Sequence, residues 1–441
     1  MEQRRKNLTQ LFIPICLETL LYMLSGMVDT LMLSSVNDQA VGAVGTANTY
    51  IGIFIIMFSV ISSGMVAVMT QNIGADRPGV AYQARQLGLA FNAVLGVIMS
   101  LFLSLGAGTI LSGVGVADAL MQPAKTYLQI VGGFCILNAL IPICSSYLRA
   151  FGFSKEPLYA SIIGNVINFC LNAFFLFVLH KGVAGVATAT VISRIINLVI
   201  VVLLGAVLVK AKQHPERESN RAVMGQIIRI GLPSACETAI YNVSMTLVIR
   251  FLNQMDAQGL NVTARSYTMQ ITNFSYCVGA ALAQANAIMT GWHIGAKEYD
   301  ACDRGTRKAA IIGVIVAVIL ETMFALCSGW IMQLFSKDPQ MVSLVGKLLA
   351  IDIVLEMGRV TNLVYGQALK TSGDAVFPVV MGACFMILCS VGGTYLFGIR
   401  LGLLAVGAYI GMAGDECVRA VGMYLRWKSG KWKEKGLVKS R

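Results

Sequence analysis

Long apolar runs separated by short polar stretches dominate the chain. Runs that contain no Asp, Glu, Lys or Arg include residues 87–117, 126–148, 157–179, 266–296 and 375–399. Each is long enough to cross a bilayer, which requires about 20 apolar residues in a helix. The runs are too long for barrel strands and lack their two-residue alternation, so helices are the expected way to satisfy the backbone in lipid.

The same pattern predicts twelve transmembrane helices and therefore an all-α integral membrane protein. The expected spans are residues 8–34, 44–74, 84–113, 123–148, 157–179, 183–209, 227–255, 262–291, 309–335, 341–369, 376–399 and 403–427. The first run follows three basic residues, as a signal peptide does, but it is long, contains Glu18 and Asp29, and lacks a small-residue cleavage site. We expect it to remain as the first helix.

Composition and charge support a membrane protein. Hydrophobic residues make up 56% of the chain and charged residues 13%, whereas soluble proteins carry about 25% charged residues. The net charge of +12 does not indicate nucleic acid, because Lys and Arg fall in alternate loops. The positive-inside rule then places both termini in the cytoplasm, predicting a multi-pass membrane protein. The eleven cysteines form no Cys-x-x-Cys pair and are interpreted as packing residues.

The chain contains an internal repeat. IPICLETLLY at 13–22 recurs as LPSACETAIY at 232–241, an offset of 219, and two later blocks recur at an offset of 221. Each half holds six predicted helices, so the two repeats insert with the same orientation. We expect an N-lobe at 1–210, a cytoplasmic linker at 211–222, and a C-lobe at 223–441 that ends in a basic tail.

Candidate chemistry is confined to ionisable residues inside the apolar spans. The sequence has no phosphate-binding Gly-x-x-x-x-Gly-Lys-[Ser/Thr] loop and no His, Ser and Asp constellation, so we expect neither an enzyme nor a cofactor. A charge near the bilayer centre costs at least about 2.5 kcal/mol, so each such group should face the protein interior or water. These residues are Glu18, Asp29, Arg194, Glu237, Arg250, Glu321, Asp352, Glu356, Arg359, Asp415, Glu416 and Arg419.

Several of these charges also have structural explanations. Glu356 and Arg359 are three apart, as are Glu416 and Arg419, so each pair could neutralise itself on one helix face. Glu321 and Asp352, which lie near outer helix ends, could be solvated.

Asp29 is different, because no basic residue lies within two turns of it on its own helix. A desolvated carboxyl can exchange a proton, or it can bind Na⁺ if amide oxygens complete the shell. Asn168 and Asn172 lie four apart and hence on one face, and they could supply such amides. Polar packing between helices is the alternative explanation for these asparagines.

Six further motifs are spread over nearly the whole chain, namely SGMVDTLMLSSV, QNIGAD, YLRAFGFSKEP, VINFCLNAFF, GVAGVATATVISR and GLPSACETAIY. Together they resemble the multidrug and toxic compound extrusion (MATE) transporters of the MOP flippase superfamily. EMGRVTNLVYGQALKTSGD and DECVRAVGMYLRWKSGKW resemble a bacterial branch. The resemblance implies two six-helix lobes that alternate access and act as a secondary multidrug efflux antiporter, exporting small organic cations or xenobiotics in exchange for H⁺ or Na⁺.

The resemblance also implies site residues. Asp29, Asn168, Asn172 and Thr190 match the N-lobe cation-coupling site of similar proteins, and the only metal expected is Na⁺ at Asp29. Some relatives have an aspartate where this chain has Asn172. The seventh-helix glutamate of another branch falls at Tyr241, so Glu237 is a candidate substitute.

The remaining C-lobe and substrate candidates are Glu356, Arg359, Asp415 and Glu416. The alternative function is a lipid-linked oligosaccharide flippase, for which Arg194, Arg250 and Arg359 would form a basic lining able to hold pyrophosphate. The expected partners are small organic cations and membrane lipid, with no nucleic acid, and the expected state is a monomer.

Overall fold

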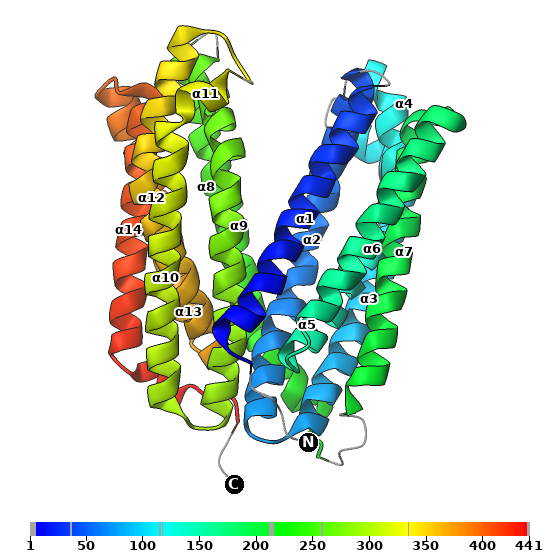
Figure 1. Cartoon of the computed structure of the whole chain (residues 1–441), viewed down its shortest axis with the longest axis vertical. Helices are drawn as coiled ribbons and strands as arrows, with labels where there is room; N and C mark the ends of the chain where they lie inside the picture. The colour runs from blue at the N-terminus through cyan, green and yellow to red at the C-terminus, as the bar shows by residue number, and fades with distance from the viewer. Residues whose placement is uncertain are drawn as a thin grey trace. The chain divides into compact units, whose positions relative to one another are not determined.

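The computed structural model describes residues 6–35, 38–113, 116, 118–210, 216–256, 259–333 and 335–438. Within these ranges all of the regular structure is helical (Figure 1). The chain separates into two compact units, Met1–Gly231 and Leu232–Arg441. The separation falls inside a continuous helix, α8 (Asn220–Met255). Residues 211–215 of the predicted linker lie outside the described residues, and α8 begins within the rest of it.

The first unit is built from long antiparallel helices. Its elements are α1 (Leu8–Ser34), α2 (Asp38–Gly74), α3 (Pro78–Gly113), α4 (Asp118–Tyr127), η1 (Leu128–Gly132), α5 (Ile136–Ala150), α6 (Lys155–Ala173), η2 (Phe174–Val178) and α7 (Gly182–Leu208). The span predicted at 123–148 is present as two helical pieces, and it bends by 43° between η1 and α5. The break lies at Gly133–Cys135, directly after a π-helical turn, and both glycine and π-turns are common causes of kinks.

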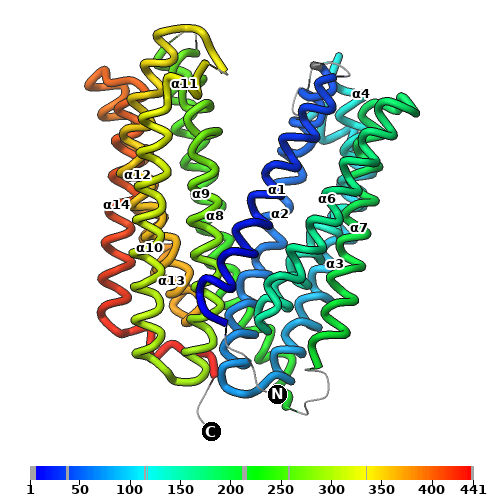
Figure 2. Tube along the Cα trace, viewed as in Figure 1, coloured from blue at the N-terminus to red at the C-terminus, as the bar shows by residue number. Residues whose placement is uncertain are grey.

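The second unit continues α8 and adds a second set of helices. They are α9 (Leu260–Gly295), α10 (Tyr299–Leu326), α11 (Ser328–Met332), α12 (Pro339–Ser372), α13 (Val376–Phe385), η4 (Met386–Val391), η5 (Thr394–Arg400), α14 (Leu404–Lys428) and η6 (Lys431–Glu434). Figure 2 follows the chain through each unit. The helix predicted at 309–335 ends at Leu326, and the short α11 follows it.

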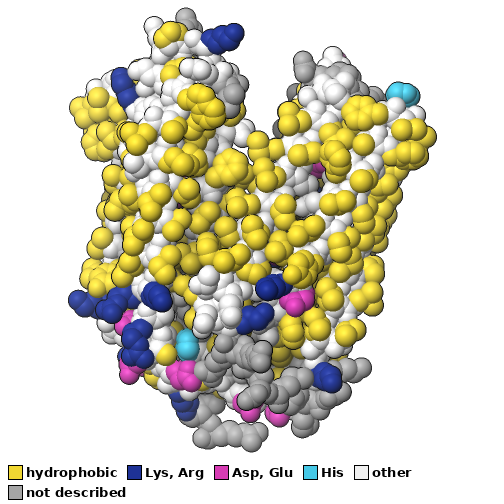
Figure 3. All heavy atoms as spheres, in the orientation of Figure 1, with side chains coloured by type: hydrophobic (Ala, Val, Ile, Leu, Met, Phe, Trp, Pro, Cys, Tyr) yellow, Lys and Arg dark blue, Asp and Glu magenta, His cyan; other side chains and the backbone are white. Residues whose placement is uncertain are grey.

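The exposed faces of both units are apolar. Of the described helices, seven are long and apolar enough to cross a membrane, or eight if the bent pair counts as one span. Four further predicted spans, α8, α9, α12 and α14, are as long but contain more polar or charged side chains. On the face shown in Figure 3, hydrophobic side chains cover the long sides of the helices, and most visible charges gather near one end of each unit. Such surfaces suit lipid contact.

Backbone features recur at equivalent positions of the sequence repeat. Gly152 and Gly373 are such a pair, and both adopt a positive φ, of 85° and 99°, just after the ends of α5 and α12. Glycine is favoured there because it enters this region without a steric penalty. The π-helical segments η2 and η5 also overlap when the two halves are aligned by the repeat. The two halves therefore share the glycines that follow their helix ends and the π-helical segments that widen their helices.

A reciprocal glycine contact joins α2 to the first turns of α8 within the first unit. A Cβ added at Gly64 would lie 2.0 Å from the carbonyl oxygen of Ile227. A Cβ added at Gly231 would lie 1.7 Å from the carbonyl oxygen of Val60. The two backbones can approach this closely only because neither residue has a side chain.

Gly231→Ala should therefore destabilise the protein, because the methyl group has no space against a backbone atom. Overpacking of this kind costs about 1–3 kcal/mol. Gly225→Ala is the matched control, since a Cβ at this exposed position of the same helix meets no atom within 4 Å. Thermal unfolding in detergent should show a lower midpoint for Gly231→Ala alone. Equal midpoints in the two variants would contradict the close contact.

One carboxylate binds the first backbone N–H groups of α9. Asp256 accepts hydrogen bonds from the backbone N–H groups of Leu260 (2.8 Å) and Asn261 (3.1 Å). Asn261 Oδ1 in turn accepts from the N–H of Ala405 (3.0 Å) at the start of α14. Desolvation alone would raise the pKa of Asp256, but the hydrogen bonds from Asn261, Leu260 and Gly259 together hold it below its ordinary value.

The stabilisation from this carboxylate should disappear in acid. A pKa that is lower in the folded than in the unfolded state contributes stability above the unfolded pKa, and that contribution is lost as the pH falls through the folded value. Asp256→Asn should therefore reduce the free energy of unfolding at neutral pH and flatten its decline towards low pH. Unfolding midpoints measured from pH 7 down to pH 3 for both proteins test this. Parallel pH profiles would show that Asp256 has no such role.

Candidate functional site

The predicted N-lobe residues meet between α1 and α6. Asn172 Nδ2 donates a hydrogen bond to Asp29 Oδ1 at 2.7 Å and another to Asn168 Oδ1 at 3.2 Å. Asn168 and Asn172 are buried, at 5% and 0% exposure, and Asp29 is half-buried. The four-residue spacing places both amides on the helix face that meets α1. The structure thus joins three residues that the sequence could only suggest were near one another.

Thr190 lies in the neighbouring helix α7, and its described hydrogen bond stays within that helix. Its buried hydroxyl donates to the carbonyl oxygen of Val186 on its own helix, at 2.9 Å. A hydroxyl has one proton to donate, so this bond leaves Thr190 with only its lone pairs for a ligand. No described contact joins it to Asp29, and its place in the coupling site remains a prediction.

Other residues around Asp29 were not grouped with it by sequence reasoning. Arg194 of α7 is close enough to act electrostatically on Asp29 and on the buried Tyr127 of α4. Asn48 of α2 lies within hydrogen-bonding reach of Tyr127. Arg194 was visible in the sequence as a charge in an apolar span, but Tyr127 lies in a charge-free run that gives no such signal.

This site can hold a monovalent cation or a proton at one carboxylate. Asn172 Oδ1 is buried and has no hydrogen-bond partner among the described residues, so one acceptor is available beside Asp29. Within the described residues, no group of three or more His, Cys, Asp and Glu side chains is arranged to hold a metal ion. A proton requires only the Asp29 carboxyl, whereas Na⁺ would require several more oxygen ligands.

In the second unit, Glu237 is held in an ion pair. Its Oε2 lies 2.6 Å from Nζ of Lys370, and both side chains are largely buried. In the first unit, Glu18 Oε2 lies 2.5 Å from Arg149 Nη2. Glu18 is equivalent to Glu237 in the sequence repeat, and Arg149 is equivalent to Lys370. We call these two contacts the paired glutamate bridges.

The surroundings of the paired glutamate bridges also correspond. In the first unit, the hydroxyl of Ser161 donates to Glu18 Oε1 at 3.3 Å. The equivalent position of the second half is Gly382, where an added Cβ would lie 3.3 Å from Cγ of Glu237. Both bridges tie the first helix of a half to the end of its fourth span. Because Lys370 neutralises Glu237, this residue is poorly suited to replace the seventh-helix glutamate of the other branch.

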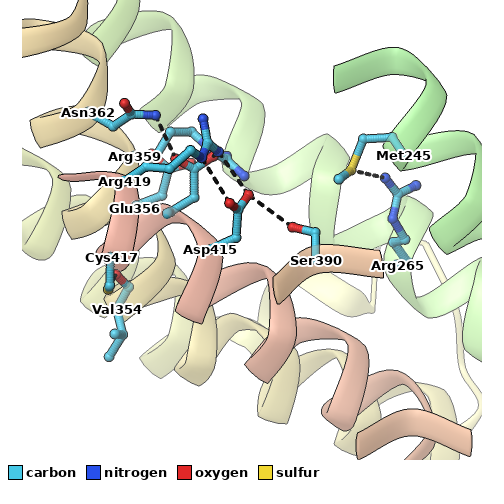
Figure 4. A network of polar contacts seen from close by, with 11 residues as sticks. Met245, Arg265, Val354, Glu356, Arg359, Asn362, Ser390, Asp415, Cys417 and Arg419 are labelled. Carbon is cyan, nitrogen blue, oxygen red and sulfur yellow. Dashed lines mark hydrogen bonds and ion pairs between the residues drawn. The ribbon is translucent and has the colours of Figure 1, made fainter. Parts of the chain in front are cut away.

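The other C-lobe candidates form one buried network on α12 and α14 (Figure 4). Arg419 pairs with Asp415 and with Glu416, each at 2.9 Å. Arg359 pairs with Glu356 on its own helix and lies 3.5 Å from Glu416 across the interface. The predicted intrahelical pairs are therefore both present, and Arg359 also joins the two helices.

Polar side chains complete this network. Asn362 Nδ2 donates to Glu416 Oε2 at 3.1 Å, and the hydroxyl of Ser390 donates to Asp415 Oδ2 at 3.0 Å. The Arg359 guanidinium also lies 6.0 Å from the ring centroid of Tyr276. Tyr241, the position of the other branch's glutamate, is half-buried and close enough to interact electrostatically with Arg359.

Glu321 and Asp352 contradict one interpretation of the sequence. Their exposures are 0% and 2%, so neither is solvated at an outer helix end. The hydrophobic pattern of α10 and α12 could not show this, because it does not reveal which neighbouring helices cover each face.

Duplicated helical units with charges inside apolar spans define this protein as a membrane transporter. The sequence model of the MatE family matches residues 14–174 and again residues 233–396, once in each half. The two matches begin at equivalent prolines of the repeat, Pro14 and Pro233. The chain therefore belongs to the MatE family.

Relatives extend this assignment over nearly the full length. The chain is 33% identical to the uncharacterized transporter YisQ of Bacillus subtilis over 431 residues, covering 96% of this chain and 94% of YisQ. It is 24% identical to the probable multidrug resistance protein NorM of Thermotoga maritima, covering 98% and 94%. A crystal structure of MATE in the bent conformation matches with a TM-score of 0.88 at 18% identity, covering 97% and 96%. The all-α membrane fold of two six-helix halves is therefore confirmed, and the protein is a transporter, not an enzyme.

Removing one member of a glutamate bridge should destabilise the fold more than removing both. Lys370→Met leaves Glu237 without its counter-charge, and loss of one partner of a buried pair costs about 3–5 kcal/mol. Adding Glu237→Gln should recover much of that loss. Arg149→Met with and without Glu18→Gln should behave in the same way.

Lys308→Met, at an exposed position of α10, is the matched control. Thermal unfolding in detergent measures all five variants. If Lys370→Met unfolds at the same temperature as Lys308→Met, the bridge does not contribute to stability.

Proposed function

We propose that this transporter exports organic cations in exchange for H⁺ or Na⁺ bound at Asp29. The observation that carries the proposal is the hydrogen bond from Asn172 to Asp29, which couples an ionisable carboxyl in α1 to a buried amide in α6. The name of the NorM relatives, probable multidrug resistance protein, supports small-molecule export. The YisQ relative is named only as a transporter and leaves the substrate open.

Protonation of Asp29 would change the hydrogen bonds that its carboxyl group can make. The carboxylate accepts a hydrogen bond from Asn172 Nδ2, but a protonated carboxyl also carries an O–H donor. The partnerless Asn172 Oδ1 is the nearby buried acceptor for that donor. Because a ligand shifts a two-state equilibrium only through different affinities for the two states, this exchange of donor and acceptor gives H⁺ a means of favouring one conformation.

H⁺ is the better supported coupling ion. The site contributes a single carboxylate, since Asn172 stands where some relatives have an aspartate. Its two amides already bond to each other, so fewer oxygens remain for Na⁺. An imposed Na⁺ gradient tests the alternative coupling ion.

The flippase alternative is less well supported by the three arginines that suggested it. Arg194 lies near Asp29, and Arg359 is paired with Glu356 and Glu416. Arg250 is exposed on α8. Two of the three guanidinium groups thus have acidic neighbours, which reduces the positive charge available to a pyrophosphate.

The membrane arrangement is part of the same proposal. The alternation of basic loops favours cytoplasmic termini in a bacterial plasma membrane. The N-lobe at 1–210, the linker at 211–222, the C-lobe at 223–441 and a monomeric state remain predictions.

Asp29→Asn should abolish coupled export without unfolding the protein, because asparagine keeps the shape and cannot exchange a proton. Ethidium export from proteoliposomes, driven separately by an imposed pH gradient and an imposed Na⁺ gradient, measures this. We expect export by the wild type under the pH gradient. Asp118→Asn, at an exposed position of α4, is the matched control and should retain export.

Three outcomes are informative. Full gradient-driven export by Asp29→Asn would overturn the assignment of the coupling site. Export driven only by the Na⁺ gradient would identify Na⁺ as the coupling ion. Absence of ethidium export by the wild type, together with movement of a pyrophosphate-linked lipid between leaflets, would favour the flippase.

A further inference from the structure

Two buried carboxyls of the second unit have no ion-pair partner in the described residues. Glu321 of α10 is 0% exposed, and neither of its carboxyl oxygens has a hydrogen-bond partner. Asp352 of α12 is 2% exposed, and its Oδ2 is without a partner. An isolated carboxylate in such a place costs several kcal/mol or more, so the group is neutral or has a bound cation.

The neighbours of these carboxyls come from three helices. Asp352, Glu356 and Arg359 of α12 act electrostatically on Glu321. Ser275 of α9 is its polar neighbour, although the hydroxyl does not have hydrogen-bond geometry to it. Glu416 of α14 acts on Asp352.

The remaining ionisable groups lie slightly further around the pair. Tyr409 of α14 is close enough to interact with Asp352, Arg359 and Arg265 of α9. Arg265 is itself buried, with Met245 Sδ 3.8 Å from its Nη2 (Figure 4). Tyr276 of α9 interacts with Arg359 and Glu356, and Asp415 and Arg419 of α14 belong to the adjoining ion-pair network.

The charges in this region do not balance if every group is ionised. The carboxyls are those of Glu321, Asp352, Glu356, Asp415 and Glu416. The guanidinium groups are fewer: Arg359 and Arg419 in the ion-pair network, and the buried Arg265 near Tyr409. Arg359 and Arg419 neutralise part of the Glu356, Asp415 and Glu416 charge. Within the described part of the chain, these two arginines form no ion pair with Glu321 or Asp352. The unpaired Glu356 Oε2 is a further buried acceptor within the same group.

A proton fits this site better than a metal ion. Among the described residues, no three His, Cys, Asp or Glu side chains are arranged to hold a metal. A proton requires no such shell, because forming one O–H bond removes the charge of a carboxylate. Arg359, at 20% side-chain exposure, is the most exposed member of the ion-pair network, and it acts electrostatically on both carboxyls.

We propose that Glu321 and Asp352 form a second proton-binding site, in the C-terminal half, which is loaded and emptied during transport. A carboxylate of the pair takes H⁺ from water on one side of the membrane, becomes a neutral acid, and returns H⁺ to water on the other side. This inference rests on the proposed H⁺-coupled export and extends it, since each half then carries a proton site. The two sites use different helices, α1 and α6 in one half and α10 and α12 in the other.

The first experiment tests protonation without requiring transport. Purified protein in detergent at pH 7 should show the infrared absorption of protonated carboxyl groups. Glu321→Gln/Asp352→Asn should lose a distinct part of that absorption, whereas Asp29→Asn should retain it. Both substitutions mimic the neutral acid, so the fold should be preserved. Glu434→Gln, at an exposed position, is the matched control and should leave the absorption unchanged.

The second experiment measures the number of protons exchanged for each ethidium. In wild-type proteoliposomes, H⁺ movement and ethidium movement are recorded together with a pH dye. The ratio of H⁺ to ethidium should fall by about half in the Glu321→Gln/Asp352→Asn variant, because Asp29 remains. Glu321→Asp keeps a carboxyl and should recover part of the ratio.

The outcomes separate this inference from the proposed function. Unchanged infrared absorption in the double variant would overturn the second site, whatever is transported. Lost absorption with an unchanged ratio would also overturn it, because the protons would then be static. If the wild type exports no ethidium, the proposed function fails and the inferred coupling fails with it. The infrared result then still decides whether Glu321 and Asp352 hold protons.

Discussion

The need to neutralise charge inside an apolar helical protein governs most of this structure. Within the described residues, most charges in the spans have an opposite partner, and these partners connect helices. The paired glutamate bridges fasten the first helix of each half, and the Arg359 and Arg419 network fastens α12 to α14. In water such contacts contribute little. In an apolar interior, losing one partner is costly, so each contact fixes helix position and register.

The exceptions to this rule are the groups suited to transport. Asp29 bonds to an uncharged amide, with Arg194 acting on it only electrostatically. Glu321 and Asp352 are outside the ion-pair network. A carboxyl without a fixed counter-charge can gain or lose a proton at modest cost, whereas one locked to arginine cannot. The need to neutralise buried charge therefore separates ion pairs that stabilise the fold from carboxyls that can gain or lose a proton.

The internal duplication explains how one chain can hold both stabilising ion pairs and carboxyls able to exchange a proton. The halves share left-handed glycines after equivalent helices, overlapping π-helical segments and the paired glutamate bridges. They differ where ionisable chemistry is placed: the counterpart of Asp29 is the buried Val248, and that of Ser161 is Gly382. The two halves thus share backbone features and one charged pair each, and they differ at other ionisable positions. The proposed division of proton binding between different helices follows this pattern.

The sequence by itself determined the helices, the repeat and the shared helix face of Asn168 and Asn172. Apolar run length is a local property, and a spacing of four places Asn168 and Asn172 on one face regardless of context. The tertiary structure alone decided that Glu237 meets Lys370, that Arg359 reaches Glu416, and that Glu321 and Asp352 are covered. These facts depend on which helix faces meet, and the meeting residues lie far apart along the chain. Hydrophobic periodicity shows that a face is apolar or polar, but it does not identify the helix against which that face packs.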